Sequence, residues 1–213
     1  MPLQIHAFES GPVATFTYLV VETEARSAVI IDAPMGSAER LVATAEREKI
    51  TPGALILTHT HWDHTADAAE LKRRYPDMLV YVHPDDEYRL TDPMMHTVWP
   101  LPFTLEALSP DRHLHDGDTF SLDGICFQVL HTPGHTEGGI CLYDKQHKVI
   151  FVGDTLFAGS VGRTDLPGGD WDTLLKSITD RLLPLPDEVR AYPGHGPVTT
   201  IGAERESNPF LGS

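Results

Sequence analysis

Four side chains that can bind metal ions fall close together in one short segment: His59, His61, Asp63 and His64. His59 and His61 are two residues apart, so their imidazoles would point the same way in an extended segment. Asp63 and His64 follow as the chain turns, so each pair could bind its own ion. Imidazole and carboxylate ligands suit zinc, iron or manganese. The alternative is a polar loop that is rich in histidine by chance.

The flanking residues predict where this segment lies in the fold. Residues 54–57 are apolar and are typical of a buried strand, and residues 66–72 are typical of the start of a helix. The four side chains would then lie on a loop between the C-terminal end of a strand and the N-terminus of a helix. Open α/β folds place ligand sites at such junctions.

Three later loops also place a histidine or an aspartate directly after an apolar strand. They carry His135, Asp154 and His195, and the loops around the two histidines are rich in Pro and Gly. Any one of these loops could be an ordinary turn. Together with the first segment, in this order, they predict one metal site built from four parts of the chain.

The remaining pattern predicts two groups of strands, each with its own helices. Ser37 and Asp170 are positioned to cap helices, and Trp171 would lie on the apolar face of the second one. We expect one α/β domain over residues 1–213, with two sheets packed face to face and helices outside. The predicted strands are residues 3–8, 15–22, 28–32, 54–57, 79–82, 120–122, 125–130, 140–143, 149–152 and 189–192. The predicted helices are residues 37–49, 66–75, 83–90, 170–183 and 200–207.

Residues 91–102 contain three prolines and fit no regular element. Such a segment could form a lid over a site or a packed surface loop. The pattern does not decide between them.

Composition excludes several classes of partner. A hydrophobic content of 41% and a charged content of 22% are ordinary for a globular protein. The net charge of −15 argues against binding to nucleic acid or to an anionic membrane. Cys126 and Cys141 lie in apolar runs and are predicted to be small core residues. No signal peptide or membrane span is evident, so we expect a cytoplasmic protein, of unspecified oligomeric state.

The ordered set of metal-binding residues resembles the pattern of the metallo-β-lactamase superfamily. This resemblance implies a four-layer αβ/βα sandwich with the site at one edge of the sheets. It implies two divalent metal ions, with zinc the first choice and iron or manganese possible, and Asp32 as a support beside the metal loop. The implied ligands are His59, His61 and His135 for the first ion, Asp63, His64 and His195 for the second, and Asp154 between them.

Within the superfamily, the sequence is similar to the glyoxalase II group, the hydroxyacylglutathione hydrolases. The similarity is carried by Trp62, by the Pro-Gly-His-Gly-Pro around His195 and by Asn208-Pro209-Phe210. Typical members continue with a helical domain that contacts glutathione, so this chain resembles a short, single-domain type.

The glyoxalase II resemblance implies hydrolysis of a small thioester such as S-(2-hydroxyacyl)glutathione. Water shared by the two ions would ionise near pH 7 and attack the acyl carbonyl. Asp63 could accept a proton during collapse of the intermediate. Arg163 is the candidate for binding a substrate carboxylate. The alternative is a buried salt bridge from Arg163 to Asp165 or Asp170.

Two other functions compete with this one. Persulfide dioxygenases look similar and hold one iron with two histidines and a carboxylate, here His59, His135 and Asp154. A metal-binding scaffold without catalysis is the third hypothesis.

The remaining histidines are not expected to bind metal. His113 and His115 superficially repeat the pattern, but no buried strand precedes them. The others are predicted to be core or surface residues: His6, His83, His96, His131 and His147.

Overall fold

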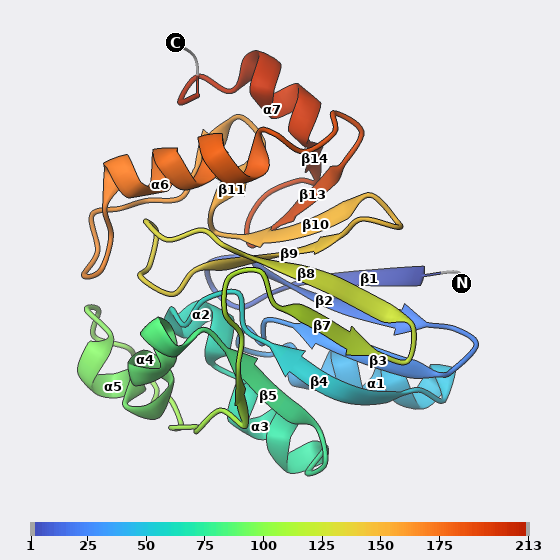
Figure 1. Ribbon diagram of the computed structural model, residues 1–213. Helices are drawn as coiled ribbons and strands as arrows, with labels where there is room; N and C mark the ends of the chain where they lie inside the picture. Colours follow the sequence, from blue (N-terminus) through green and yellow to red (C-terminus); the bar gives the residue numbers. More distant parts are fainter. Residues whose placement is uncertain (1–2, 212–213) are drawn as a thin grey trace.

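The computed structural model describes residues 3–211 and contains two mixed six-stranded sheets (Figure 1). The first has the order β1-β2-β3-β4-β5-β6, with β1 to β3 antiparallel and β3 to β6 parallel. Its strands are β1 (Leu3–Ser10), β2 (Thr15–Glu22), β3 (Ser27–Ile31), β4 (Thr51–Ile56), β5 (Leu79–Val82) and β6 (Arg112–His113).

The second sheet has the order β14-β13-β10-β9-β8-β7, in which only β10 and β13 run parallel. The turn between β7 and β8 uses Asp123 and Gly124, both at positive φ, as a tight two-residue hairpin requires. The strands of this sheet are β7 (Thr119–Leu122), β8 (Ile125–His131), β9 (Ile140–Asp144), β10 (Val149–Gly153), β13 (Arg190–Pro193) and β14 (Thr199–Thr200). A small ribbon of β11 (Leu156–Phe157) and β12 (Ser160–Val161) follows β10.

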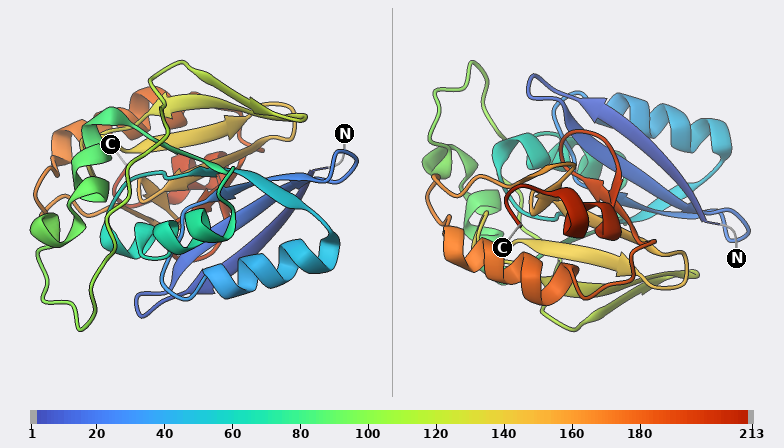
Figure 2. Two further views of the ribbon diagram at one scale, coloured as in Figure 1. Left: turned by 90° about the horizontal axis from the view of Figure 1, so that it is seen from below. Right: turned by 90° about the horizontal axis from the view of Figure 1, so that it is seen from above.

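Helices cover the outer face of each sheet (Figure 2). The first sheet carries α1 (Ala38–Glu48) and α3 (Ala68–Arg74). The second carries α6 (Trp171–Ser177), its π-helical continuation η2 (Ile178–Leu182), and α7 (Ile201–Ser207). Shorter helices lie near one end of the sheets: α2 (Trp62–Thr65), η1 (Pro84–Asp86), α4 (Glu87–Thr91) and α5 (Pro93–His96). Within residues 3–211, every helix is too short or too polar to cross a membrane.

Three apolar cores separate the four layers. Successive side chains of a strand point to opposite faces, so Val29 and Ile31 of β3 pack between the sheets, while Ala28 and Ile30 pack against the helices. The third core lies between the second sheet and its helices and includes Leu174. The predicted αβ/βα sandwich is thus confirmed.

Several local predictions were wrong. Ser37 precedes α1, but its hydroxyl does not cap the helix; the carboxylate of Asp67 accepts the N–H of Ala38 instead, at 2.9 Å. β4 begins at Thr51 rather than at the predicted residue 54, because α1 already ends at Lys49, which adopts the left-handed conformation. The predicted irregular segment 91–102 contains the short helix α5.

Two predicted core residues are exposed. Cys141 is buried, but Cys126 is not, because the alternation of β8 directs Ile125 and Phe127 into the core and Cys126 away from it. Trp171 is 41% exposed and contacts Phe210 rather than the sheet.

Candidate metal centre

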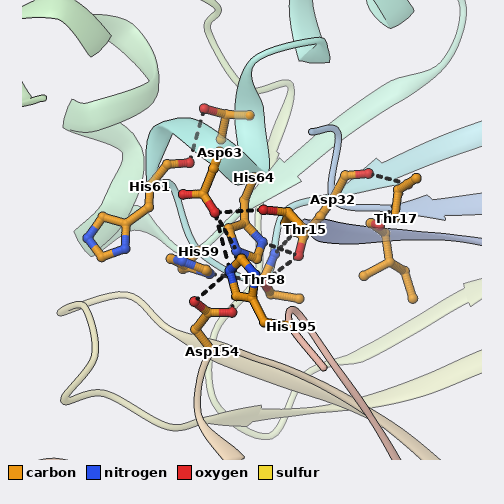
Figure 3. Close-up of polar contacts among 12 residues, drawn as sticks. Thr15, Thr17, Asp32, Thr58, His59, His61, Asp63, His64, Asp154 and His195 are labelled. Atoms are coloured by element: carbon orange, nitrogen blue, oxygen red, sulfur yellow. Dashed lines mark hydrogen bonds and ion pairs between the residues drawn. The ribbon is translucent and has the colours of Figure 1, made fainter. Parts of the chain in front are cut away.

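The structure brings the seven predicted ligands together at one end of the two sheets. Figure 3 labels all of them except His135. They form three overlapping groups in which the ligand atoms lie within 4.8 Å of one another. The groups are His59, His61 and His135; His59, His64 and Asp154; and Asp63, His64 and His195. The first and third groups have the membership expected for two separate ions, and Asp154 lies next to both.

The first ligands come from the chain that leaves β4. His61 is still extended, and its Nδ1 lies 2.9 Å from Nε2 of His135 on the other sheet. The helix then begins at Trp62, four residues earlier than expected, so Asp63 and His64 lie in its first turn. This change of backbone direction sends Asp63 and His64 to a different point from His59 and His61.

Backbone contacts hold the other loops against this segment. The N–H of Gly194 donates to the carbonyl of Gly153 at 2.8 Å, which joins the His195 loop to the Asp154 loop. Nδ1 of His135 lies 2.7 Å from the carbonyl of Arg163. If Nδ1 carries the proton, this contact leaves the Nε2 lone pair of His135 free for a cation.

Asp32 supports the metal loop from the end of β3. Its Oδ1 accepts the N–H of Thr58 at 2.7 Å, and its Oδ2 lies 2.8 Å from Nδ1 of His64. Both Asp32 and His64 are buried. A carboxylate on one imidazole nitrogen orients the ring and makes the other nitrogen a better ligand.

Three buried atoms at the centre lack a hydrogen-bond partner among the described residues. They are Nε2 of His59, Nε2 of His64 and Oδ1 of Asp154, of which the last two lie 3.3 Å apart as an ion pair. Buried polar atoms without partners are rare because they have lost their hydration without replacement. Once His64 has lost its proton, the two imidazole nitrogens and the carboxylate oxygen are all electron-pair donors, so a divalent cation would satisfy them together. The residues therefore fit the metal ions that the fold implies.

Two ligands of the first group, His59 and His61, are already deprotonated at pH 7. Burial, together with His135, lowers the pKa of His61 to about 3. Burial, with His64 and His135, also holds the pKa of His59 well below its ordinary value. Neutral imidazole is the metal-binding form.

The second group retains protons. Burial opposes the charged form of His64, but Asp154, Asp63 and Asp32 together raise its pKa well above the ordinary value. Hydrogen bonds to Asp154 and Asp63 likewise outweigh burial and raise the pKa of His195 to about 10. A cation at this group must displace those protons.

Asp86 is a residue at the centre that sequence reasoning missed. Its Oδ2 accepts the N–H of Thr60, between His59 and His61, and its Oδ1 accepts the N–H of Gly138 at 2.7 Å. The carboxylate is fully buried and pairs with Arg89 at 3.0 Å. Asp86 thus connects the two loops of the first group. Its sequence context, one of several acidic residues at a helix start, carries no signal of this role.

A cavity of about 340 Å³ opens beside the ligands. Arg163 lines it, but its guanidinium makes a two-bond pair with Asp165 at 2.7 Å, and both side chains are exposed. The salt bridge considered from sequence therefore exists with Asp165 but is not buried, while Asp170 caps α6. The residues that line the cavity besides the ligands are Val13, Trp62, Trp99, Arg163 and Leu166.

The other histidines divide into two kinds. His113 is exposed and pairs with Glu87 at 2.7 Å, outside the described candidate metal groups. His83 and His131 come together with Asp85 in a fourth group of possible ligand atoms. Sequence spacing could not show this group, because its residues come from different sheets.

The family model of the metallo-beta-lactamase superfamily matches residues 10–195 of the chain. Among curated proteins, hydroxyacylglutathione hydrolase GloC of Haemophilus influenzae is 42% identical over 190 residues, covering 88% of this chain and 89% of GloC.

Two solved structures are similar over nearly the whole chain. The BLEG-1 B3 metallo-beta-lactamase has a TM-score of 0.91 and 38% identity, covering 99% of this chain and 100% of its own. TTHA1623 in a di-iron-bound form has a TM-score of 0.85 and 41% identity, covering 97% of this chain and 100% of its own.

Proposed function

The chain belongs to the metallo-β-lactamase superfamily of metal-dependent hydrolases, and from this premise we propose that it hydrolyses thioesters of the S-(2-hydroxyacyl)glutathione class. The observation that carries the proposal is the convergence of seven ligands, three of which have a buried donor or acceptor atom that makes no hydrogen bond within residues 3–211. The similarity to GloC supports the choice of thioester. We propose two divalent ions, one for each outer group of ligands. Zinc is our first choice, and the di-iron form of TTHA1623 makes iron the main competitor.

Bound cations supply Lewis acidity, which lowers the pKa of water from about 15.7 to near 7 and polarises a carbonyl group. The chain supplies the rest. His59 and His61 are held in the neutral form, so they can act as ligands without first losing a proton. Asp32 and Asp86 fix the loops before substrate arrives, so little reorganisation is needed during the reaction.

Asp63 is placed to accept a proton. Among the described residues its contacts all involve Oδ2, which accepts the Thr15 hydroxyl at 2.8 Å and lies 3.3 Å from Nε2 of His195. Burial opposes ionisation, but His64 and the hydrogen bond from His195 lower the pKa of Asp63 to about 2, so it is ionised. Its Oδ1 is free to accept a proton as the tetrahedral intermediate collapses and the thiolate leaves.

The cavity provides the substrate contacts. Trp62, Trp99 and Leu166 offer apolar surface that excludes water from the acyl group. The guanidinium of Arg163 lies over the ring of Trp99, 5.5 Å from its centre. We propose that it binds a substrate carboxylate in competition with Asp165.

The test is thiol release from S-lactoylglutathione by protein loaded with zinc, iron or manganese, with metal content measured in the same samples. Turnover with two ions per chain supports the proposal. Inactivity of fully loaded protein on a panel of acyl thioesters would rule it out.

Two further assays separate competing reactions of the same site. The pair of His135 Nε2 and Asp154 Oδ2, 3.6 Å apart and near His59, is compatible with a single iron, as in a persulfide dioxygenase. Oxygen uptake with glutathione persulfide and one iron per chain would establish that function instead. The likeness to BLEG-1 makes a β-lactam the second acyl substrate to assay.

A further inference from the structure

A second cluster of metal-binding side chains lies apart from the seven ligands. His83 directly follows β5 of the first sheet, and His131 ends β8 of the second. Their imidazoles stack with ring centres 4.1 Å apart and planes within 10°. Asp85 completes the group, and one ligand atom from each residue lies within 4.8 Å of the others.

Each imidazole has a nitrogen placed to offer a lone pair to a cation. Nε2 of His131 lies 2.9 Å from the backbone carbonyl of Glu137, and a ring that donates there carries its lone pair on Nδ1. Such a carbonyl contact is the usual way in which proteins orient a metal-binding histidine. Burial, with His131 nearby, lowers the pKa of His83 to about 4.

Asp85 adds the charge that a cation requires. Its Oδ2 lies 3.7 Å from Nδ1 of His83, too far for a hydrogen bond but close enough for one ion to contact both. The N–H of Asp85 donates to the same Nδ1 at 3.3 Å, a long bond that an ion would replace. The carboxylate is exposed, so solvent reaches the cluster from that side.

We propose that His83, Asp85 and His131 form a separate binding site for a divalent transition-metal ion such as Zn²⁺. Two imidazoles and one carboxylate suit zinc or copper, whereas magnesium and calcium prefer oxygen ligands. Three protein ligands leave a position for water or for His115, whose ring centre lies 6.0 Å from that of His83.

An ion at this site would join the two sheets beside the catalytic loops. It would link the turn after β5 to the end of β8, and Asp86, next to Asp85, holds Thr60 and Gly138. The expected consequence is structural: ligand binding to the folded state alone raises its stability. The site is not needed for turnover under the proposed function.

The test measures zinc directly. Wild-type protein and three variants are equilibrated with the same free Zn²⁺, and zinc per chain is determined together with thioesterase activity. His131→Gln keeps an amide that can donate to the Glu137 carbonyl and should bind one zinc fewer per chain. Asp85→Asn, at an exposed position, should weaken the binding of zinc at this site at least about tenfold.

The matched control is His113→Gln, which removes an exposed histidine of the same surface and should retain every ion. Crystals grown with zinc should show an anomalous peak beside the Nδ1 atoms of His83 and His131, with the two rings turned out of their parallel stack so that both in-plane lone pairs reach the ion. Equal zinc content in wild type, His131→Gln and Asp85→Asn, or no peak at saturating zinc, would overturn the proposal. Because zinc content is the readout, this outcome does not depend on whether thioesters are hydrolysed.

Discussion

The carboxylate of Asp86 accepts a hydrogen bond from the backbone N–H of Thr60 at 3.0 Å, although the two residues are 26 positions apart. The same Oδ2 accepts the hydroxyl of Thr136, next to His135, at 2.9 Å. One buried carboxylate therefore fixes the spacing between the two loops that carry His59, His61 and His135. This geometry makes Asp86 a positioning residue for the first group of ligands.

Asp86→Asn should weaken metal binding at the first group by about 10–100-fold, the range seen when groups behind metal ligands are changed. It should also lower the free energy of unfolding by about 3 kcal/mol, because the buried guanidinium of Arg89 loses its buried carboxylate partner and keeps only Glu137, whose side chain is 42% exposed. Chelator competition and urea unfolding measure the two effects. The control is Glu87→Gln, an exposed neighbour, and an Asp86→Asn protein with wild-type metal affinity would contradict the assignment.

Asp32→Asn should affect the second group instead. The amide cannot reproduce both the contact to His64 and the acceptor for Thr58, so His64 loses its fixed orientation. We expect the affinity of the second group for its metal ion to fall by about 10–100-fold. The absorption spectrum of the Co²⁺-substituted protein reports it. Asp67→Asn, which changes only the cap of α1, should leave the spectrum unchanged.

Metal binding should release protons unequally. His61, with a pKa lowered to about 3, is already neutral at pH 7, whereas His195, with a pKa raised to about 10, is protonated. The affinity of the group that contains His195 should therefore rise with pH up to about 10, because fewer protons must leave. Calorimetric titration with Zn²⁺ in buffers of different ionisation enthalpy counts the protons. If the first and second equivalents of Zn²⁺ released the same number of protons, the two groups of ligands would be protonated alike.

Gly194→Ala should abolish the second metal. A Cβ at this position would lie 2.1 Å from Oδ1 of Asp154 and 2.6 Å from Cε1 of His64, so both ligands would have to move. Gly196→Ala meets no atom within 4 Å and should retain the metal, at a cost of about 1 kcal/mol for its positive φ. Zinc content and thermal unfolding of the two variants provide the comparison. A zinc content in Gly194→Ala that matched Gly196→Ala would disprove the steric argument.

Arg163→Met should raise the KM for a carboxylate-bearing thioester about three- to tenfold with little change in kcat, because an exposed charged contact contributes modestly. Asp165→Asn should act in the opposite direction, since it frees the guanidinium from its two-bond pair. Steady-state kinetics with a thioester that lacks the carboxylate serves as the control. Identical KM values for both substrates in every variant would exclude Arg163 from binding.

Local pattern was enough to predict much of the fold. β10 is a continuous apolar run, and β2 is rich in β-branched and aromatic residues. The turn at Asp123-Gly124 is typical of a two-residue hairpin. The placement of His135, Asp154 and His195 in the loops that follow strands is likewise a local property. The sequence pattern failed where burial depends on tertiary packing. At Cys126 the buried and exposed side chains of β8 alternate as expected, but the face that carries Cys126 is open to solvent.

The sequence by itself determined which side chains could bind metal and that each follows a strand, because ligand type and strand periodicity are encoded over a few residues. Only the tertiary structure decided which of them meet. Asp86 reaches Gly138 across 52 positions, and His83 stacks on His131 from the other sheet. Such contacts depend on how two sheets pack and on burial that removes water from their polar atoms, and neither property is encoded in the spacing of nearby residues.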